Sequence, residues 1–288
     1  MKVNVWQFQG VLLESYYRPP GASEPLPPHS HEDYQFTLSL THTGRYYYRG
    51  ANYLVPVGSL SVIHPGEMHQ TRPLAVNHTP RRFKVMYIPT ATMRQAAMEV
   101  AGRDIGLPFF AEPTILNSQL GAEFLSLHQT LSGTASQLES ESRLLLAIAQ
   151  LIVGYAADRP QPPAVGKAHS AVRRVKEYLQ ENYAQNVSLA DLANLAQLSA
   201  FHLNRVFAKE VGLTPYAYQT QVRIARAKRL LASGLPPVQV AIATGFYDQS
   251  HIGKHFKRLV GVTPGSYASS KNILDKDGKP NVSFDRTS

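Results

Sequence analysis

The spacing of apolar positions changes along this chain, and the change predicts two domains of different class. Residues 1–90 contain short runs rich in β-branched and aromatic residues, separated by turns with glycine or proline, which is typical of an all-β barrel or sandwich. From about residue 90 the apolar positions recur every three or four residues, which predicts helices over 92–102, 118–132 and 136–158. The chain therefore begins with a β domain that has flanking helices.

The longest predicted helix is apolar on more than one stripe. Leu138, Leu145 and Ile152 recur at seven-residue steps, and Leu144 and Leu151 widen the face that they form. A helix of this kind packs on two sides. We expect one side to cover the barrel and the other to contact a second protomer in a homodimer; a simple core helix is the alternative.

A proline-rich segment follows this helix and marks a domain boundary. Proline cannot continue a helix, and segments such as Arg159-Pro-Gln-Pro-Pro163 form semi-rigid spacers. We therefore expect an N-terminal domain over 1–158, a linker over 159–168, a helical domain over 169–270 and a polar, disordered tail over 271–288.

The helical domain contains a repeat with an offset of 49 residues. Residues 207–218 and 256–267 share Phe, Val, Gly, Thr, Pro and Tyr at matching positions, and Leu203 and Ile252 keep the same offset. Self-similarity at a fixed period indicates one supersecondary unit used twice. Each copy has the pattern of two helices joined by a tight turn, with Leu203, Ile252 and the repeated phenylalanines in the core.

Capping residues predict where the helices of this domain begin and end. Ser188, Ser199 and Asp248 are suited to start helices, and Asp191 supports Ser188 in a capping box. Gly212 and the matching glycine 49 residues later are suited to end the second helix of each unit.

The formal charge of +9 is concentrated on the repeat. Residues 167–270 hold 13 basic and 5 acidic residues, whereas residues 1–166 hold 12 of each. This distribution indicates a polyanionic partner, and together with the repeated pattern of two helices and a turn it favours double-stranded DNA. The absence of cysteine excludes disulfides and a thiol nucleophile, and there is neither a secretion signal nor an 18-residue apolar run. We expect a cytoplasmic protein with no membrane partner.

In a helix-turn-helix, the second helix enters the DNA major groove and its N-terminal residues reach the base edges. The candidates for this role are Phe201, His202, Asn204 and Arg205 in the first unit and Gln249, Ser250, His251 and Lys254 in the second. Arginine pairs with guanine and asparagine with adenine, each worth about 1–3 kcal/mol of discrimination. We expect His255, Lys257 and Arg258 to contact phosphates or to face solvent.

The second unit carries a recognisable motif. Residues 245–264, with their Gly-Phe start, Ser-X-X-X-X-Phe spacing, Phe-Lys-Arg and Gly-X-Thr-Pro, resemble the signature of the AraC/XylS family of bacterial transcription regulators. Residues 188–233 resemble the family's first unit and linker helix. The resemblance implies promoter binding through successive major grooves and RNA polymerase as a partner. It carries base contact onto Phe201, Asn204, Arg205, Gln249, Ser250, His251 and Lys254. Gly253 departs from the family, which usually offers a side chain there.

Two histidine-bearing segments, His29-Ser-His31 and Pro65–His69, resemble the short motifs of a cupin barrel, which AraC-like regulators often carry as an effector module. The resemblance implies an α+β two-domain protein with an N-terminal cupin-like β-barrel and a C-terminal all-α domain. In metal cupins, two histidines, a carboxylate and a distant histidine hold the metal. Here the carboxylate position falls on Gln35, a weaker ligand, so we expect no metal and no cofactor.

A small-molecule effector in the barrel needs an apolar pocket with a few polar anchors. The candidates for its contacts are His29, His31, Gln35, Tyr46, Tyr48, His69 and Tyr87, with Arg18 and Arg72 for an acidic ligand. Tyr46, Tyr47 and Tyr48 alternate across a strand, so they cannot all face the interior. His64 is expected to be structural.

Several alternatives stay open at this point. One alternative is a barrel that holds a metal through His29, His31 and His69, and another is a barrel whose histidines are structural and whose only role is dimerisation. For the whole chain the alternatives are a cupin enzyme fused to a DNA-binding module and a nucleoid structural protein without sequence preference. For the helical domain the alternative is a protein-interaction module. We favour a regulator that is not an enzyme.

Overall fold

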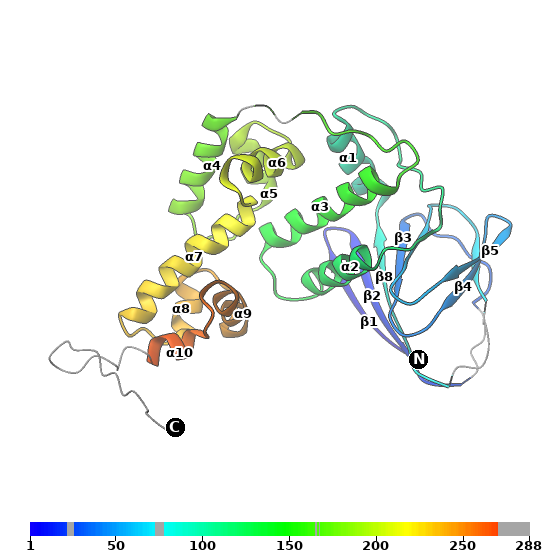
Figure 1. Cartoon of the computed structure of the whole chain (residues 1–288), viewed down its shortest axis with the longest axis horizontal. Helices are drawn as coiled ribbons and strands as arrows, with labels where there is room; N and C mark the ends of the chain where they lie inside the picture. Colours follow the sequence, from blue (N-terminus) through cyan, green and yellow to red (C-terminus); the bar gives the residue numbers. More distant parts are fainter. Residues whose placement is uncertain (22–25, 73–77, 165, 167, 270–288) are drawn as a thin grey trace, which may run out of the picture. The chain divides into compact units, whose positions relative to one another are not determined.

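The computed structural model describes residues 1–21, 26–72, 78–164, 166 and 168–269. The chain divides into two compact units (Figure 1). The N-terminal unit comprises residues 1–134, 139–166 and 199–202, and the C-terminal unit comprises residues 135–138, 167–198 and those from 203 onward. The expected tail over 271–288 lies outside the described residues.

The strands of the N-terminal unit form two antiparallel sheets. The strands are β1 (Lys2–Phe8), β2 (Val11–Arg18), β3 (Tyr34–Ser39), β4 (Gly44–Tyr48), β5 (Ala51–Val55), β6 (Leu60–Ile63), β7 (His69–Thr71), β8 (Arg81–Ile88) and β9 (Thr114–Ile115). One sheet has six strands in the order β1-β2-β8-β3-β6-β9, and the other has three in the order β5-β4-β7.

The α+β two-domain fold is confirmed, and in the cupin-like domain the described strands do not close into one hydrogen-bonded barrel. Pro65 lacks an N–H, and Gly66 has a φ of 73°, so the chain turns directly after β6. The next strand, β7, has only three residues and pairs with β4 in the smaller sheet. The result is two facing sheets with an antiparallel topology.

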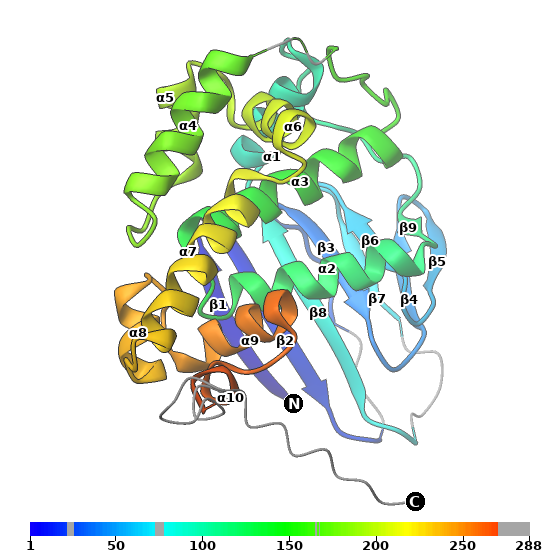
Figure 2. The same cartoon turned by 60° about the vertical axis from the view of Figure 1, so that its left-hand side comes forward.

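Strand β3 is buried along its whole length because it is covered on both faces. Phe36 and Leu38 belong to the core that also contains side chains of the three helices of this unit. These helices are α1 (Thr90–Ala101), α2 (Ser118–Leu131) and α3 (Gln137–Tyr155). Helix α2 lies across the six-stranded sheet (Figure 2) and contacts β1, β3 and β8. The alternate residues of β3 therefore point away from the helices.

The C-terminal unit is helical throughout its described secondary structure, as the sequence predicts. Its helices are α4 (His169–Glu181), α5 (Leu189–Ala196), α6 (Ala200–Val211), α7 (Pro215–Ala232), α8 (Pro237–Ala243), α9 (Gln249–Val260) and α10 (Pro264–Ser269). None of the described helices of the chain combines the length and the apolar character needed to cross a lipid bilayer.

Candidate nucleic-acid interface and ligand cavity

The sequence repeat corresponds to a repeat of structure. Helices α6 and α9 each have 12 residues and begin 49 positions apart, at Ala200 and Gln249. Each follows a shorter helix, α5 or α8, after a tight connection. The long helix α7 joins the two helix-turn-helix units. The predicted pair of helix-turn-helix units is therefore confirmed in its order and spacing.

Side-chain caps fix the start of each second helix. The Ser199 hydroxyl accepts a hydrogen bond from the backbone N–H of His202 at 3.2 Å, and the Asp248 carboxylate accepts one from His251 N–H at 2.6 Å. Ser188 and Asp191 form the predicted capping box at the start of α5. These caps confirm the helix starts predicted from the sequence.

The apolar stripe of each second helix is buried, which leaves the other faces for DNA. Leu203, Phe207, Ile252 and Phe256 are all 0% exposed, as expected for core positions. A helix in the major groove must present polar side chains on the face opposite such a stripe. Helices α6 and α9 are therefore oriented in equivalent ways within their helix-turn-helix units.

The predicted base-contacting residues differ in their accessibility. In α9, Gln249, Ser250 and Lys254 are exposed and His251 is half-buried; in α6, His202 and Arg205 are half-buried. Phe201 is only 6% exposed and Asn204 only 1%. A base contact by Phe201 or Asn204 therefore requires a conformation in which the side chain is accessible, and the contact stays a prediction.

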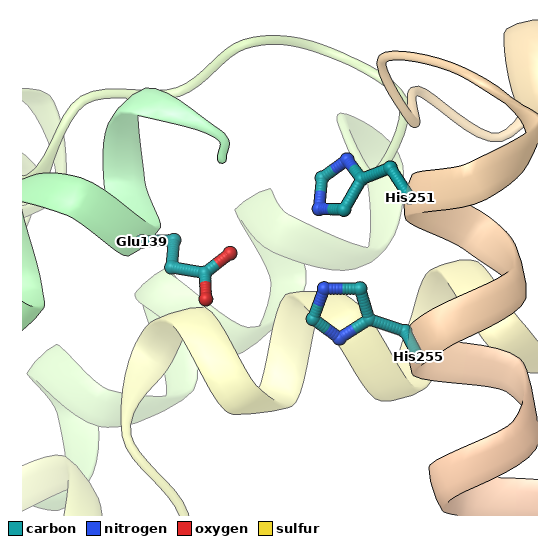
Figure 3. A group of neighbouring side chains, drawn as sticks. All are labelled: Glu139, His251 and His255. Atoms are coloured by element: carbon teal, nitrogen blue, oxygen red, sulfur yellow. The ribbon is translucent and has the colours of Figure 1, made fainter. Parts of the chain in front are cut away.

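His255 is buried, which corrects the expectation that it faces solvent or phosphate. It is 4% exposed, and its ring stacks on Phe246 with centroids 5.9 Å apart. Its ring also lies 4.8 Å from that of His251, one turn earlier on α9 (Figure 3). The signal was present in the sequence, because His255 follows the core residue Ile252 by three positions. Glu139, also drawn there, belongs to the N-terminal unit.

Gly253 lies in the interior of α9, where glycine is unfavourable. A Cβ added at this position would meet no atom within 4 Å. Alanine loses less backbone entropy on folding, so Gly253→Ala is expected to stabilise the C-terminal unit by about 0.5–1 kcal/mol. Hydrogen exchange of α9 amides checks this, and faster exchange in the variant would contradict it.

A buried arginine ties the connecting helix α7 to its surroundings. Arg223 is 3% exposed and donates hydrogen bonds to the carbonyl oxygens of Tyr183, at 2.6 Å, and Gln185, at 2.9 Å. Its guanidinium also lies 5.7 Å from the ring centroid of Phe246, which precedes α9. Burial lowers the pKa of Arg223 to about 10, so it stays charged at neutral pH. These contacts hold α7 against both halves of the domain.

The N-terminal unit contains a cavity of about 200 Å³ between its two sheets. Alternate residues of β3, namely Gln35, Thr37 and Ser39, line one side, and Tyr46 of β4 contributes from the smaller sheet. The remaining described side chains that line it come mainly from β2, β8 and the loops: Met1, Tyr16, Arg18, Leu26, His29, His42, Thr43, Arg45, Val55, His69, Thr71, Arg72, Arg81, Phe83, Val85 and Tyr87.

Most of the expected effector contacts come together at this cavity. The candidates that line it are His29, Gln35, Tyr46, His69, Tyr87, Arg18 and Arg72. His31 is not among the lining residues, although its ring lies 5.0 Å from that of His69 and 5.4 Å from that of Tyr87.

Tyr48 lies outside the cavity because its hydroxyl is held elsewhere. It donates to Glu67 and lies 3.1 Å from His64 Nδ1, in a network that also contains Arg49. His64 accepts a hydrogen bond from Phe110 N–H at Nε2, at 2.9 Å, so it has the structural role expected of it. Tyr47 is 38% exposed, which confirms that the three consecutive tyrosines do not share one side.

The three candidate metal-binding histidines are anchored by their own loops. His29, His31 and His69 each place Nδ1 near a backbone carbonyl oxygen, that of Pro27, Asp33 and Glu67 respectively. Burial lowers the pKa of His31, and burial lowers that of His69 to about 4. The ring centroid of His69 lies 4.2 Å from that of His29 and 5.0 Å from that of His31, so the three imidazoles are neighbours.

Sequence reasoning missed several basic and aromatic residues of the cavity: Tyr16, His42, Arg45, Arg81 and Phe83. A usable signal existed. On β8, Arg81, Phe83, Val85 and Tyr87 occupy every second position, so they share one face of the strand. Because Tyr87 was already an expected effector contact, the same face of β8 would have identified Arg81 and Phe83.

Comparison with known proteins covers both units. The family profile described as "AraC-like ligand binding domain" matches residues 17–148, and that described as "Helix-turn-helix domain" matches residues 192–270. The HTH-type transcriptional regulator YbfI of Bacillus subtilis is 32% identical over 238 residues, covering 82% of this chain and 84% of the relative. The transcriptional regulator GlxA of Rhizobium meliloti is 34% identical over 114 residues, covering 39% of this chain and 34% of the relative.

Two solved structures to which the chain is similar are an isolated regulator domain and a full-length regulator. A probable AraC family regulator of Rhodopseudomonas palustris is 25% identical with a TM-score of 0.34, covering 35% of this chain and 97% of that one. ToxT of Vibrio cholerae is 13% identical with a TM-score of 0.39, covering 90% of this chain and 97% of that one.

Proposed function

Because this chain belongs to the AraC-like family of helix-turn-helix transcription regulators, we propose that a small-molecule effector in its N-terminal cavity controls its binding to DNA. The protein is a DNA-binding transcription regulator with an N-terminal ligand-binding domain. The observation that carries the proposal is the cavity of about 200 Å³, which combines aromatic walls with polar anchors. An effector changes DNA binding only if it binds two states of the protein with different affinity.

The proposed DNA contacts follow from the equivalent placement of α6 and α9. Their N-terminal halves enter successive major grooves about 34 Å apart on one side of the duplex. Residues 167–270 supply a net charge of +8, which attracts the phosphate backbone. The residues proposed to contact bases are Phe201, His202, Asn204, Arg205, Gln249, Ser250, His251 and Lys254.

Selection of binding sites from random duplex DNA by the full-length protein tests this function. We expect enrichment of a site with two sequence elements about one helical turn apart. Adding the effector should change the affinity for that site. An enriched pool with no common sequence would contradict the proposal and favour a nucleoid structural protein.

Arg205 and Lys257 offer a matched comparison within the two second helices. Arg205→Ala is expected to relax preference at one base position of the selected site, with a loss of about 1–3 kcal/mol on that site. Lys257 is exposed in the last turn of α9, and Lys257→Ala should weaken binding to all DNA sequences equally. Competition binding with single-base variants of the site measures both. A uniform loss for Arg205→Ala would reduce its role to a phosphate contact.

We also propose that the protein is a homodimer joined through α3. Leu145 of this helix packs against the N-terminal core, whereas Leu146, half-buried, is not part of that core cluster. Leu146→Glu is therefore expected to yield monomers in sedimentation velocity because a charge cannot be buried unpaired at an apolar interface. Gln150→Glu, at an exposed position of α3, is the control and should remain a dimer. A dimer of Leu146→Glu would place the interface elsewhere.

The curated relatives are transcription regulators, and we propose that this protein likewise acts without catalysis, in the cytoplasm, together with RNA polymerase. A metal-dependent enzyme in the N-terminal unit predicts stoichiometric metal that is lost on His69→Ala. Elemental analysis of the purified protein distinguishes the two.

A further inference from the structure

The ligand cavity carries an excess of positive charge. Four arginines line it, and the described lining contains no aspartate or glutamate. Three histidines, His29, His42 and His69, add further nitrogen donors. A cavity with this composition is electrostatically complementary to an anion.

Two of the arginines are direct neighbours across a pair of strands. Arg18 at the end of β2 is the register partner of Arg81 at the start of β8. Like charges placed directly opposite each other destabilise a sheet. Burial and the charge of Arg18 both lower the pKa of Arg81, and burial and these two guanidiniums lower the pKa of His42. The fold thus maintains a pair of positive charges at a place where they repel each other.

The Arg18 side chain also has unused hydrogen-bonding capacity. Its Nε is buried and has no hydrogen-bond partner among the described residues. Leaving a buried charged donor unsatisfied costs more than an ordinary hydrogen bond contributes. A carboxylate between Arg18 and Arg81 would supply an acceptor for Arg18 Nε and oppose both positive charges, and carboxylates pair with guanidinium groups in a bidentate geometry.

Beside the arginine pair, the wall of the cavity is flat and apolar. Phe83 stacks on Tyr16 with ring centroids 4.6 Å apart and planes inclined by 11°, and the Arg18 guanidinium lies 6.0 Å from the Phe83 centroid. Val55 and Val85 add aliphatic surface. A planar body attached to the acid group would find its contacts here.

We propose that the effector of this protein is a small organic carboxylate with a flat, apolar body, held by Arg18 and Arg81 and packed beside Phe83. The inference deepens the proposed function and rests on this cavity being the effector site. A neutral polyol would not oppose the positive charge that the four arginines bring to the cavity. A cavity of about 200 Å³ is small beside the range of about 300–1,000 Å³ usual for drug-sized ligands, so it favours a one-ring body.

Matched pairs of acids and amides test the charge requirement in the unmodified, full-length protein. The probes are benzoate and phenylacetate, their neutral amides benzamide and phenylacetamide, and inorganic phosphate, measured by titration calorimetry. We expect at least one acid to bind, and its amide to bind about 10- to 100-fold more weakly, because hydrogen bonds to a charged group are lost. Phosphate should bind more weakly than the acid because it lacks the flat body.

Variants then locate the acid group. Arg18→Gln and Arg81→Gln are expected to weaken binding of the acid about 10- to 100-fold without changing amide binding. Arg82→Gln is the control, because Arg82 is exposed and follows Arg81, so it points to the other side of β8. Arg18→Lys keeps the charge and loses the planar guanidinium that can donate two parallel hydrogen bonds. Its affinity for the acid should lie between those of the unmodified protein and Arg18→Gln.

Three results would overturn the inference: no binding of either acid at millimolar concentration, equal affinity for acid and amide, or unchanged acid affinity in both Arg18→Gln and Arg81→Gln. The proposed function has a separate outcome. If an acid binds through the arginine pair and leaves DNA affinity unchanged, the inference stands and effector control fails. If a neutral compound in this cavity changes DNA affinity, effector control stands and the inference fails.

Discussion

Lowering the pH from 7.5 to 5 is expected to destabilise the N-terminal unit by several kcal/mol. Three of its histidines, His64, His69 and His128, are 6%, 2% and 0% exposed. Burial is the main cause that lowers the pKa of each to about 4 from an ordinary value of 6.5. Each is therefore neutral in the folded protein at pH 5, whereas the same residue in the unfolded chain is mostly protonated.

The direction follows from proton linkage. Between pH 6.5 and 4 the unfolded state binds more protons than the folded state, so the free energy of unfolding falls as the pH falls. The contribution is complete above pH 6.5 and is lost through this window. A difference of roughly 2.5 pKa units corresponds to about 3 kcal/mol for one group over the whole window. At pH 5 about half or more of that loss is expected for each histidine.

The single tryptophan gives a local probe for this measurement. Trp6 lies in β1, and its ring is 5.9 Å from that of His128, so its fluorescence reports on the N-terminal unit. Urea unfolding midpoints at pH 7.5 and 5 measure the loss. His128→Gln retains an N–H donor for the carbonyl oxygen of Glu14, which His128 Nε2 contacts at 3.1 Å, and should reduce the pH dependence.

A surface histidine provides the control. His78 is exposed, and His78→Gln should leave the difference between the two midpoints unchanged. Equal pH dependence in His128→Gln and the unmodified protein would contradict a role for the buried imidazole.

The sequence predicted features that depend on neighbours in the chain. The caps at Ser199 and Asp248 and the 49-residue offset of α6 and α9 all follow from local patterns, and the structure confirms them. The burial of Ile252 and Phe256 follows from helical periodicity in the same way. Local patterns succeed here because the hydrogen bonds of a helix and of its caps join residues only a few positions apart in the sequence.

The cavity was only partly predictable, because its composition depends on strand register. Arg18 meets Arg81 only through the pairing of β2 with β8, which no local pattern specifies. Tyr48 shares a strand face with Tyr46 by alternation, yet its hydroxyl reaches His64 and Glu67, which the chain brings close from the following turn. Contacts between segments distant in sequence decide which side chains a cavity receives.

Gly245→Ala is expected to destabilise the second helix-turn-helix unit by about 3 kcal/mol or more. Gly245 follows α8 with a φ of +76°, a conformation that costs other residues about 1–2 kcal/mol. A Cβ there would also lie 2.7 Å from Ala184 Cα and closer still to the carbonyl oxygen of Ala184. Both atoms belong to backbone, so the turn before α9 must shift.

Gly212→Ala separates the two causes, because Gly212 has nearly the same φ, +77°, and no atom within 4 Å of an added Cβ. Gly212→Ala should lower the free energy of unfolding only by the backbone cost of the positive φ, about 1–2 kcal/mol. Hydrogen exchange measured by mass spectrometry follows α8 and α9 separately from α5 and α6. Gly245→Ala should raise exchange in α8 and α9 and abolish protection of one of the two DNA elements in a footprint. Similar exchange in both variants would mean that the backbone near Ala184 yields to the added methyl group at little cost.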